Sequence, residues 1–197
     1  MGNQFLLKEF KIPMQEIISR KEFLKNAFRI FQVPQRDKVK DTDSFIYAPG
    51  IESESEFLNT CTQAYDCISK CPHEALLVYR ENPEDKRYGF PVIKPDQAAC
   101  YLCDDFPCIT ACRSGALNLK NKTRKLGLAV INQQTCFAYN DTFCQSCVIN
   151  CPLSGEAIFM TVDSKPEISD VHCTGCGICV QSCPAGTSAI AIKANLK

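Results

Sequence analysis

Fifteen cysteines fall into four short runs, and their spacing is the feature of this chain that is best suited to chemistry. The last run reads Cys173-Thr-Gly-Cys176-Gly-Ile-Cys179-Val-Gln-Ser-Cys183-Pro184. This C-x2-C-x2-C-x3-C-P pattern is typical of a loop that binds a [4Fe–4S] cluster, in which each iron takes one thiolate. The other runs are variants of it, and they comprise Cys61, Cys67 and Cys71; Cys100, Cys103, Cys108 and Cys112; and Cys136, Cys144, Cys147 and Cys151.

The spacing within a run follows from the shape of the cluster. Three cysteines separated by two residues can curl around one end of a cluster, and Gly175 and Gly177 let the backbone approach closely enough to aim N–H groups at the sulfurs. The same loop cannot also reach the far side. The fourth cysteine, followed by proline, therefore points to another cluster, as it does in two-cluster ferredoxins. The runs are expected to work in pairs.

Two other uses of many cysteines must be weighed. A disulfide framework is typical of small secreted chains, whereas this chain has 197 residues and no secretory signal. A structural zinc site takes two well-separated cysteine pairs, whereas these runs add C-x3-C and usually proline. A zinc-binding interaction module remains the alternative, and it would be colourless.

Composition excludes several classes of function. Lys and Arg together number 22, as do Asp and Glu, so the net charge of zero gives no nucleic-acid footprint. No apolar stretch approaches the roughly 18 residues that span a bilayer, so the chain is not expected to cross a membrane by itself. The segment from Ser19 to Lys25 resembles a twin-arginine export motif with Lys21 as its second basic residue, but a charged, short segment follows it, and a cytoplasmic location is expected. No nucleophile set, phosphate loop or paired carboxylates are visible, so the chain is not expected to be an enzyme by itself.

Charge and hydrophobic spacing divide the chain into two regions. Residues 1–40 hold nine Lys or Arg residues, and apolar residues recur at helical spacing between Pro13 and Pro34. Residues 1–50 are therefore predicted to be a basic helical arm, which either packs on its own core or docks on a partner. Residues 51–197 are predicted to be a double ferredoxin-like domain that binds several clusters.

Short apolar segments around the runs predict strands. They follow the runs at 75–78, 116–119, 157–160 and 189–192, and they precede the later runs at Val92-Ile93, 128–131 and Ile168. Neighbouring segments are expected to form hairpins across the loops at 80–90, 120–127 and 163–166. The predicted class is α+β, with tandem ferredoxin-like units made of cluster-binding loops and short antiparallel hairpins.

From Phe57 onward the chain resembles the four-cluster ferredoxin-like subunits of molybdenum and tungsten oxidoreductases, including the β subunit of dimethyl sulfoxide reductase and the ferredoxin-type proteins of periplasmic nitrate reduction. The resemblance is carried by Cys100-Tyr-Leu-Cys103-Asp-Asp-Phe-Pro-Cys108-Ile-Thr-Ala-Cys112 and by the wide gap between Cys136 and Cys144. The chain departs from the pattern at Arg113, where proline is usual, and at Ala64, where the first run should have its second cysteine.

The resemblance implies a nested pairing of the runs, first with fourth and second with third. It also implies three [4Fe–4S] clusters and a fourth site that is either vacant or holds a [3Fe–4S] cluster. His73 and His172 flank cysteines and are expected to lie beside the clusters or on the surface rather than to bind iron; His73 is the nearest candidate in the sequence to complete the fourth site, and His172 is the better candidate to tune a cluster. The implied ligand sets are Cys100, Cys103, Cys108 and Cys151; Cys136, Cys144, Cys147 and Cys112; Cys173, Cys176, Cys179 and Cys71; and, for the fourth site, Cys61, Cys67 and Cys183.

The same resemblance implies a role in electron transfer. Single electrons would pass along the clusters between a redox donor protein and a larger catalytic oxidoreductase subunit that contains molybdenum or tungsten. Soluble anaerobic complexes are the expected setting, and the small ferredoxin subunit of tungsten-dependent class II benzoyl-CoA reductase is one specific possibility. A free-standing polyferredoxin that shuttles between enzymes is the alternative within this class.

Overall fold

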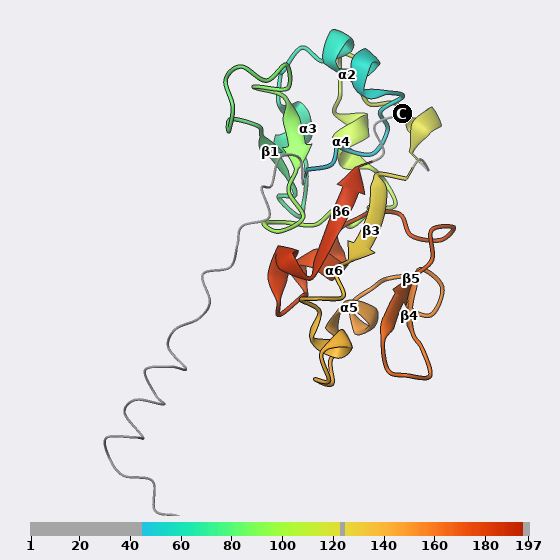
Figure 1. The fold of residues 1–197 in the computed structure, drawn as a ribbon. Helices are drawn as coiled ribbons and strands as arrows, with labels where there is room; N and C mark the ends of the chain where they lie inside the picture. Colours follow the sequence, from blue (N-terminus) through green and yellow to red (C-terminus); the bar gives the residue numbers. More distant parts are fainter. Residues whose placement is uncertain (1–44, 123–124, 195–197) are drawn as a thin grey trace, which may run out of the picture. The chain divides into compact units, whose positions relative to one another are not determined.

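The computed structural model describes residues 45–122 and 125–194 (Figure 1). The predicted helix between Pro13 and Pro34 lies outside these residues. Residues 45–50, which the sequence analysis assigned to the arm, pack into the core: Phe45 is 3% exposed and Ile46 is fully buried. Ile46 also forms an antiparallel β-bridge with Ile93, so the packed core extends to residues before position 51.

The elements are short, and most of the described chain consists of loops. The helices are α2 (Glu54–Thr60), α3 (Asp66–Ser69), α4 (Pro107–Thr110), α5 (Ser146–Ile149) and α6 (Ile178–Gln181). Single 3-10 turns are η1 (Leu119–Asn121), η2 (Phe137–Tyr139) and η3 (Gly186–Ser188). The strands are β1 (Leu76–Val78), β2 (Pro91–Ile93), β3 (Gly127–Ile131), β4 (Ile158–Met160), β5 (Pro166–Ile168) and β6 (Ile190–Ala194). The α+β class is as predicted.

Helix α2 has a clear local cause. The Ser53 hydroxyl accepts the N–H of Glu56 at 3.2 Å and caps the first turn, where Glu54 and Glu56 also face the positive end of the helix dipole. Phe57 on this helix is 1% exposed and lies with its ring centroid 5.0 Å from that of Tyr47. The helix therefore fixes an aromatic cluster beneath the first cysteine run.

The strands form three antiparallel pairs. β1 pairs with β2 and β4 pairs with β5, as predicted across the loops at 80–90 and 163–166. The hairpin predicted across 120–127 is wrong: β3 pairs with β6, from Gly127 opposite Ala194 to Ile131 opposite Ile190. The segment at 116–119 forms no strand, because the N–H of Asn118 is donated to the carbonyl of Gly50 at 2.8 Å and η1 follows at once.

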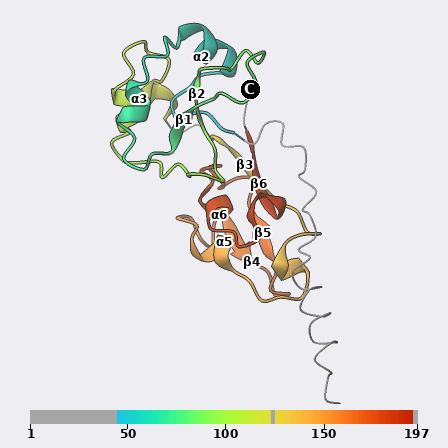
Figure 2. The ribbon, with the colours of Figure 1, turned by 90° about the vertical axis from the view of Figure 1, so that its left-hand side faces the viewer.

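These pairings separate the described residues into a first half, 45–122, and a second half, 125–194. In both views α2, α3 and β1 lie together, as do α5, α6, β4 and β5 (Figures 1 and 2). Helix α3 packs against α4 in the first half, and α5 packs against α6 in the second. None of the helices in the described ranges is long and apolar enough to cross a membrane.

Candidate metal centres

The four runs share one local geometry. The cysteine before the last one in each run occupies the second position of a four-residue helix: Cys67 in α3, Cys108 in α4, Cys147 in α5 and Cys179 in α6. The last cysteine follows two residues after the helix ends. Its N–H is donated to a carbonyl of that helix, as from Cys71 to Ile68 at 3.2 Å and from Cys183 to Val180 at 3.2 Å. The last thiol is thereby displaced from the loop that holds the other thiols of its run.

A sharp turn precedes three of these helices. Tyr65, Phe106 and Gly177 all have left-handed backbone conformations, with φ of 61°, 44° and 90°. Such a conformation costs a non-glycine residue free energy. At Tyr65 the turn is supported by a hydrogen bond from the tyrosine hydroxyl to the carbonyl of Gly89 at 2.9 Å.

All fifteen cysteines are free thiols, and they line four pockets that we call sites I to IV. Site I is lined by Cys61, Cys67 and Cys112. Site II is lined by Cys71, Cys100, Cys103 and Cys108. Site III is lined by Cys151, Cys173, Cys176 and Cys179, with Cys100 at its edge. Site IV is lined by Cys136, Cys144, Cys147 and Cys183.

This grouping differs from the nested pairing that the resemblance implies. Cys71 lies with the second run rather than the fourth, and Cys112 lies with the first run rather than the third. Likewise, Cys151 lies with the fourth run and Cys183 with the third. The physical reason is packing: α3 contacts α4 and α5 contacts α6, while the β3–β6 pair closes the third and fourth runs into one half. Each run exchanges its last thiol with its neighbour in the sequence.

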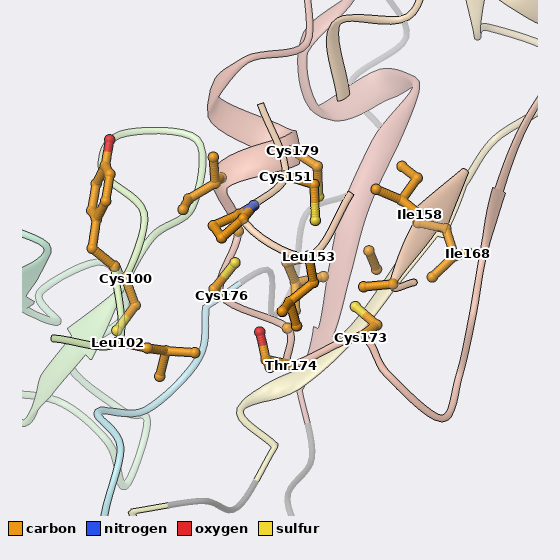
Figure 3. A pocket seen from close by; sticks show the side chains of 18 residues that line it. Cys100, Leu102, Cys151, Leu153, Ile158, Ile168, Cys173, Thr174, Cys176 and Cys179 are labelled. Atoms are coloured by element: carbon orange, nitrogen blue, oxygen red, sulfur yellow. The ribbon is translucent and has the colours of Figure 1, made fainter. Parts of the chain in front are cut away.

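Site III encloses a cavity of about 340 Å³. Figure 3 shows Cys151, Cys173, Cys176 and Cys179 around this space, with Cys100 set apart on a segment of the first half. Apolar side chains complete the wall, among them Leu153, Ile158 and Ile168. Within the described ranges no three His, Cys, Asp or Glu side chains are gathered around a single-ion position.

The two glycines of the fourth run are required by packing rather than only by the approach to sulfur. A Cβ on Gly175 would lie 2.3 Å from the backbone nitrogen of Gly127, at the start of β3. A Cβ on Gly177 would lie 2.6 Å from Cβ of Pro95, in the first half. Both glycines also have positive φ. The loop of site III is therefore pressed against β3 on one side and against the first half on the other.

Burial raises the thiol pKa values in all four sites. The pKa of Cys67 in site I rises to about 12, through burial and the neighbouring Cys61 and Cys112 thiols. Burial likewise raises the pKa of Cys108 in site II and of Cys147 in site IV to about 11, and it raises that of Cys179 in site III. A raised pKa keeps a thiol protonated at neutral pH, so these groups would act as thiolate ligands only with a bound metal centre to stabilise the negative charge.

Backbone N–H groups partly offset the free-energy cost of burying a thiolate. The N–H of Ala75 donates to Sγ of Cys71 at 3.4 Å, and the N–H of Leu117 donates to Sγ of Cys112 at 3.4 Å. Hydrogen bonds of this kind stabilise the thiolate form that binds metal.

Sites II and III meet at the junction of the two halves. The N–H of Cys100, in site II, donates to the carbonyl of Cys176, in site III, at 2.9 Å. The Cys176 thiol also contributes to raising the pKa of Cys100, after burial and the thiol of Cys108. One peptide hydrogen bond thus joins two residues whose thiols line different sites.

Neither histidine completes site I. His73 lines site II, where its ring stacks on that of Tyr101 with centroids 4.1 Å apart. His172 shares a hydrogen bond of 3.1 Å between its Nδ1 and the hydroxyl of Ser169.

Sequence reasoning missed Cys112 as the third thiol of site I, because the nested order sent it to the third run. The signal that could have indicated it is the two-cluster pattern itself, in which neighbouring runs exchange their last cysteines.

Comparison with known proteins identifies a cluster-binding domain in the second half. A family model described as a 4Fe-4S dicluster domain matches residues 128–184, which contain the third and fourth runs and no part of the first two. A domain of two clusters contained in these residues is consistent with the exchange of Cys151 and Cys183 between sites III and IV.

Longer matches extend over both halves. The chain is 33% identical to the methylamine utilization ferredoxin-type protein MauM of Paracoccus denitrificans over 158 residues, which is 75% of this chain and 70% of that protein. It is 33% identical to MauM of Methylorubrum extorquens over 155 residues, 73% of this chain and 70% of that protein. It is 28% identical to the ferredoxin-type protein NapG of Escherichia coli over 158 residues, 73% of this chain and 68% of that protein.

Proposed function

Because the chain belongs to the family of the ferredoxin-type protein MauM, it is an iron–sulfur electron-transfer protein and not a catalyst, and we propose that it carries single electrons along three [4Fe–4S] clusters. The observation that carries this proposal is the grouping of four thiols around each of sites II, III and IV. When bound, such clusters accept and release one electron at a time.

The ligands we assign follow the observed groups. Each complete site takes three thiols from one run and the last thiol from its neighbour, which suits a cluster with one thiolate per iron. The assigned sets are Cys71, Cys100, Cys103 and Cys108 for site II; Cys151, Cys173, Cys176 and Cys179 for site III; and Cys136, Cys144, Cys147 and Cys183 for site IV.

We infer that the two halves are tandem ferredoxin-like units and that the sites follow one another in the order I, II, III, IV. Three neighbour relations support this order. The Cys108 thiol of site II lies close enough to Cys67 of site I to help raise the pKa of Cys67, after burial and the thiols of Cys61 and Cys112. The backbone N–H of Cys100 donates a hydrogen bond to the carbonyl of Cys176 across the junction of the halves. In the second half, the Cys147 thiol of site IV similarly helps to raise the pKa of Cys179 in site III.

The partner we propose is a larger catalytic oxidoreductase subunit that contains molybdenum or tungsten. A separate redox donor protein would supply the electrons. The resemblance of the second and third runs to subunits of such enzymes supports it. MauM is named for methylamine utilization, so a redox enzyme of amine metabolism is the competing partner class. A cytoplasmic, anaerobic setting is proposed with it.

Anaerobic purification of the full chain tests the function. We expect a brown protein with at least about 12 irons and as many sulfides per chain, because three cubanes carry four of each. Dithionite should bleach the colour, and a one-electron oxidant should restore it. A colourless protein with about four zinc ions would show that the zinc-binding alternative is correct.

Affinity purification from the native organism tests the partner. We expect a larger subunit to co-purify, with molybdenum or tungsten detected in the complex. Recovery of the brown chain alone, as a monomer that exchanges electrons with several enzymes, would instead favour the free-standing shuttle.

A further inference from the structure

We propose that site I binds a [3Fe–4S] cluster through Cys61, Cys67 and Cys112, with the fourth corner of the cluster open to solvent beside Ala64. This inference rests on the proposed iron–sulfur function of sites II to IV. It concerns the one site in the described residues that has three thiols, one fewer than the four irons of a cubane require.

The disagreement comes from the position of Ala64. In the first run Ala64 stands three residues before Cys67, where the fourth run has Cys176 before Cys179. Ala64 lines site I with the three thiols, and it is exposed. Each iron of a cubane needs one ligand, and a methyl group supplies none. Three irons can therefore be held, while the fourth corner faces water.

Three other groups could be considered as a fourth ligand, and each either has a partner or lies in another site. The Asp66 carboxylate pairs with Arg113, with Oδ2 and Nε 3.5 Å apart. The Tyr65 hydroxyl donates to the carbonyl of Gly89. His73 lies in site II. None of these three groups therefore replaces the missing thiolate.

Site I is nevertheless built like a complete site. Cys67 is 8% exposed, in the same helical position as the third cysteine of every other run. The Sγ of Cys112 accepts the N–H of Leu117 at 3.4 Å, which repeats the bond from Ala75 to Cys71 in site II. The last cysteine is therefore prepared as a thiolate ligand in both sites.

Both departures from the cysteine pattern meet in this pocket. Ala64 removes a thiolate, and Arg113 replaces the usual proline after the last cysteine of the second run; the two residues are far apart in the sequence, yet both line site I. A cluster with three thiolates would carry net negative charge, and the exposed Arg113 guanidinium, although paired with Asp66, places a positive group at the edge of this site. The two changes are complementary for such a cluster.

The first test uses the natural full-length protein, prepared anaerobically and then mildly oxidised. We expect about 15 irons per chain, because three cubanes and one three-iron cluster add to that number. We also expect the paramagnetic resonance signal of an oxidised [3Fe–4S] cluster. About 12 irons without the signal would mean that site I is vacant, and about 16 without the signal would mean that a fourth ligand exists. Either result would overturn the proposal.

A pair of variants locates the signal. Because Ala64 is exposed, Ala64→Cys adds a thiol without disturbing the core, and it should abolish the signal and raise the iron content to about 16. Ala64→Val, which is close to cysteine in size, should keep both the signal and about 15 irons, since its side chain has no atom that can bind iron. A signal that survives unchanged in Ala64→Cys comes from a damaged cubane and contradicts the assignment to site I.

The two proposals fail in different ways. Protein that holds about 12 irons and bleaches reversibly, but gives no three-iron signal, refutes only the assignment of site I. Folded protein without iron refutes the electron-transfer assignment as a whole.

Discussion

The last cysteine of each run decides which loops are joined. Cys71 ends the first run, yet its thiol lines site II with the second run, and the N–H of Ala75 is donated to it. If neighbouring runs exchange their last cysteines, loss of the Cys71 thiol affects a loop of the same half. In a nested order it would affect the fourth run, in the other half.

The substitution Cys71→Ser separates these outcomes. We expect hydrogen exchange, followed by mass spectrometry on the anaerobic protein, to speed up in the loop 100–108 and to stay unchanged in 173–179, because only site II loses a ligand. Cys151→Ser is the matched control, with the effect expected in 173–179 instead. Faster exchange at 173–179 in Cys71→Ser would support the nested order.

At the scale of elements, the contact of the site III loop with β3 depends on two glycines. Gly175 and Gly127 meet backbone to backbone, and any side chain on Gly175 would overlap atoms of β3. Gly155 provides a matched comparison, because it has similar positive φ, +87° against +73°, but no atoms within 4 Å of its would-be Cβ.

Gly175→Ala should therefore cost far more than Gly155→Ala. The left-handed backbone alone costs an alanine about 1–2 kcal/mol, and overpacking adds about 1–3 kcal/mol at Gly175 only. Thermal unfolding of the iron-loaded variants measures the difference, and loss of about four irons from Gly175→Ala would place the damage at site III. Equal unfolding temperatures for the two variants would contradict the close contact.

What could be predicted at this scale was local. The hairpins β1–β2 and β4–β5 join segments that are close in sequence, and alternating apolar residues indicated them correctly. The β3–β6 pair joins distant segments, and nothing within either segment specifies its partner. Asn118 shows the same limit, since its N–H is taken by Gly50 from before the first run. The pairing of the runs followed these distant contacts, so the cysteine spacing predicted the loops but not which loops share a site.

At the scale of the whole molecule, stability is expected to depend on metal and on pH together. Buried or half-buried thiols line every site, and burial raises the pKa values of several of them, as at Cys67 and Cys147. Release of a cluster then leaves thiols that take up protons, so lower pH favours release.

A chelator titration measures this coupling. The chelator concentration that removes half of the brown absorbance should fall as the pH is lowered from about 8.5 to about 6.5, since protons compete with iron for the thiolates across this range. Near-ultraviolet circular dichroism should be lost with the colour, because the loops that hold the thiols need the clusters to keep their folded packing. A midpoint that does not change with pH would contradict proton uptake on release.

The β3–β6 pair also has a mechanical consequence. Gly127 and Ala194 are register partners at one end of the ladder, so the second half begins and ends at the same point of its sheet. Tension applied through these two residues would load the hydrogen bonds of an antiparallel pair one after another, as in a zipper, rather than all at once in shear. The sheet would yield from that end first, and the loops that hold the thiols of sites III and IV would bear the load only after the ladder had opened.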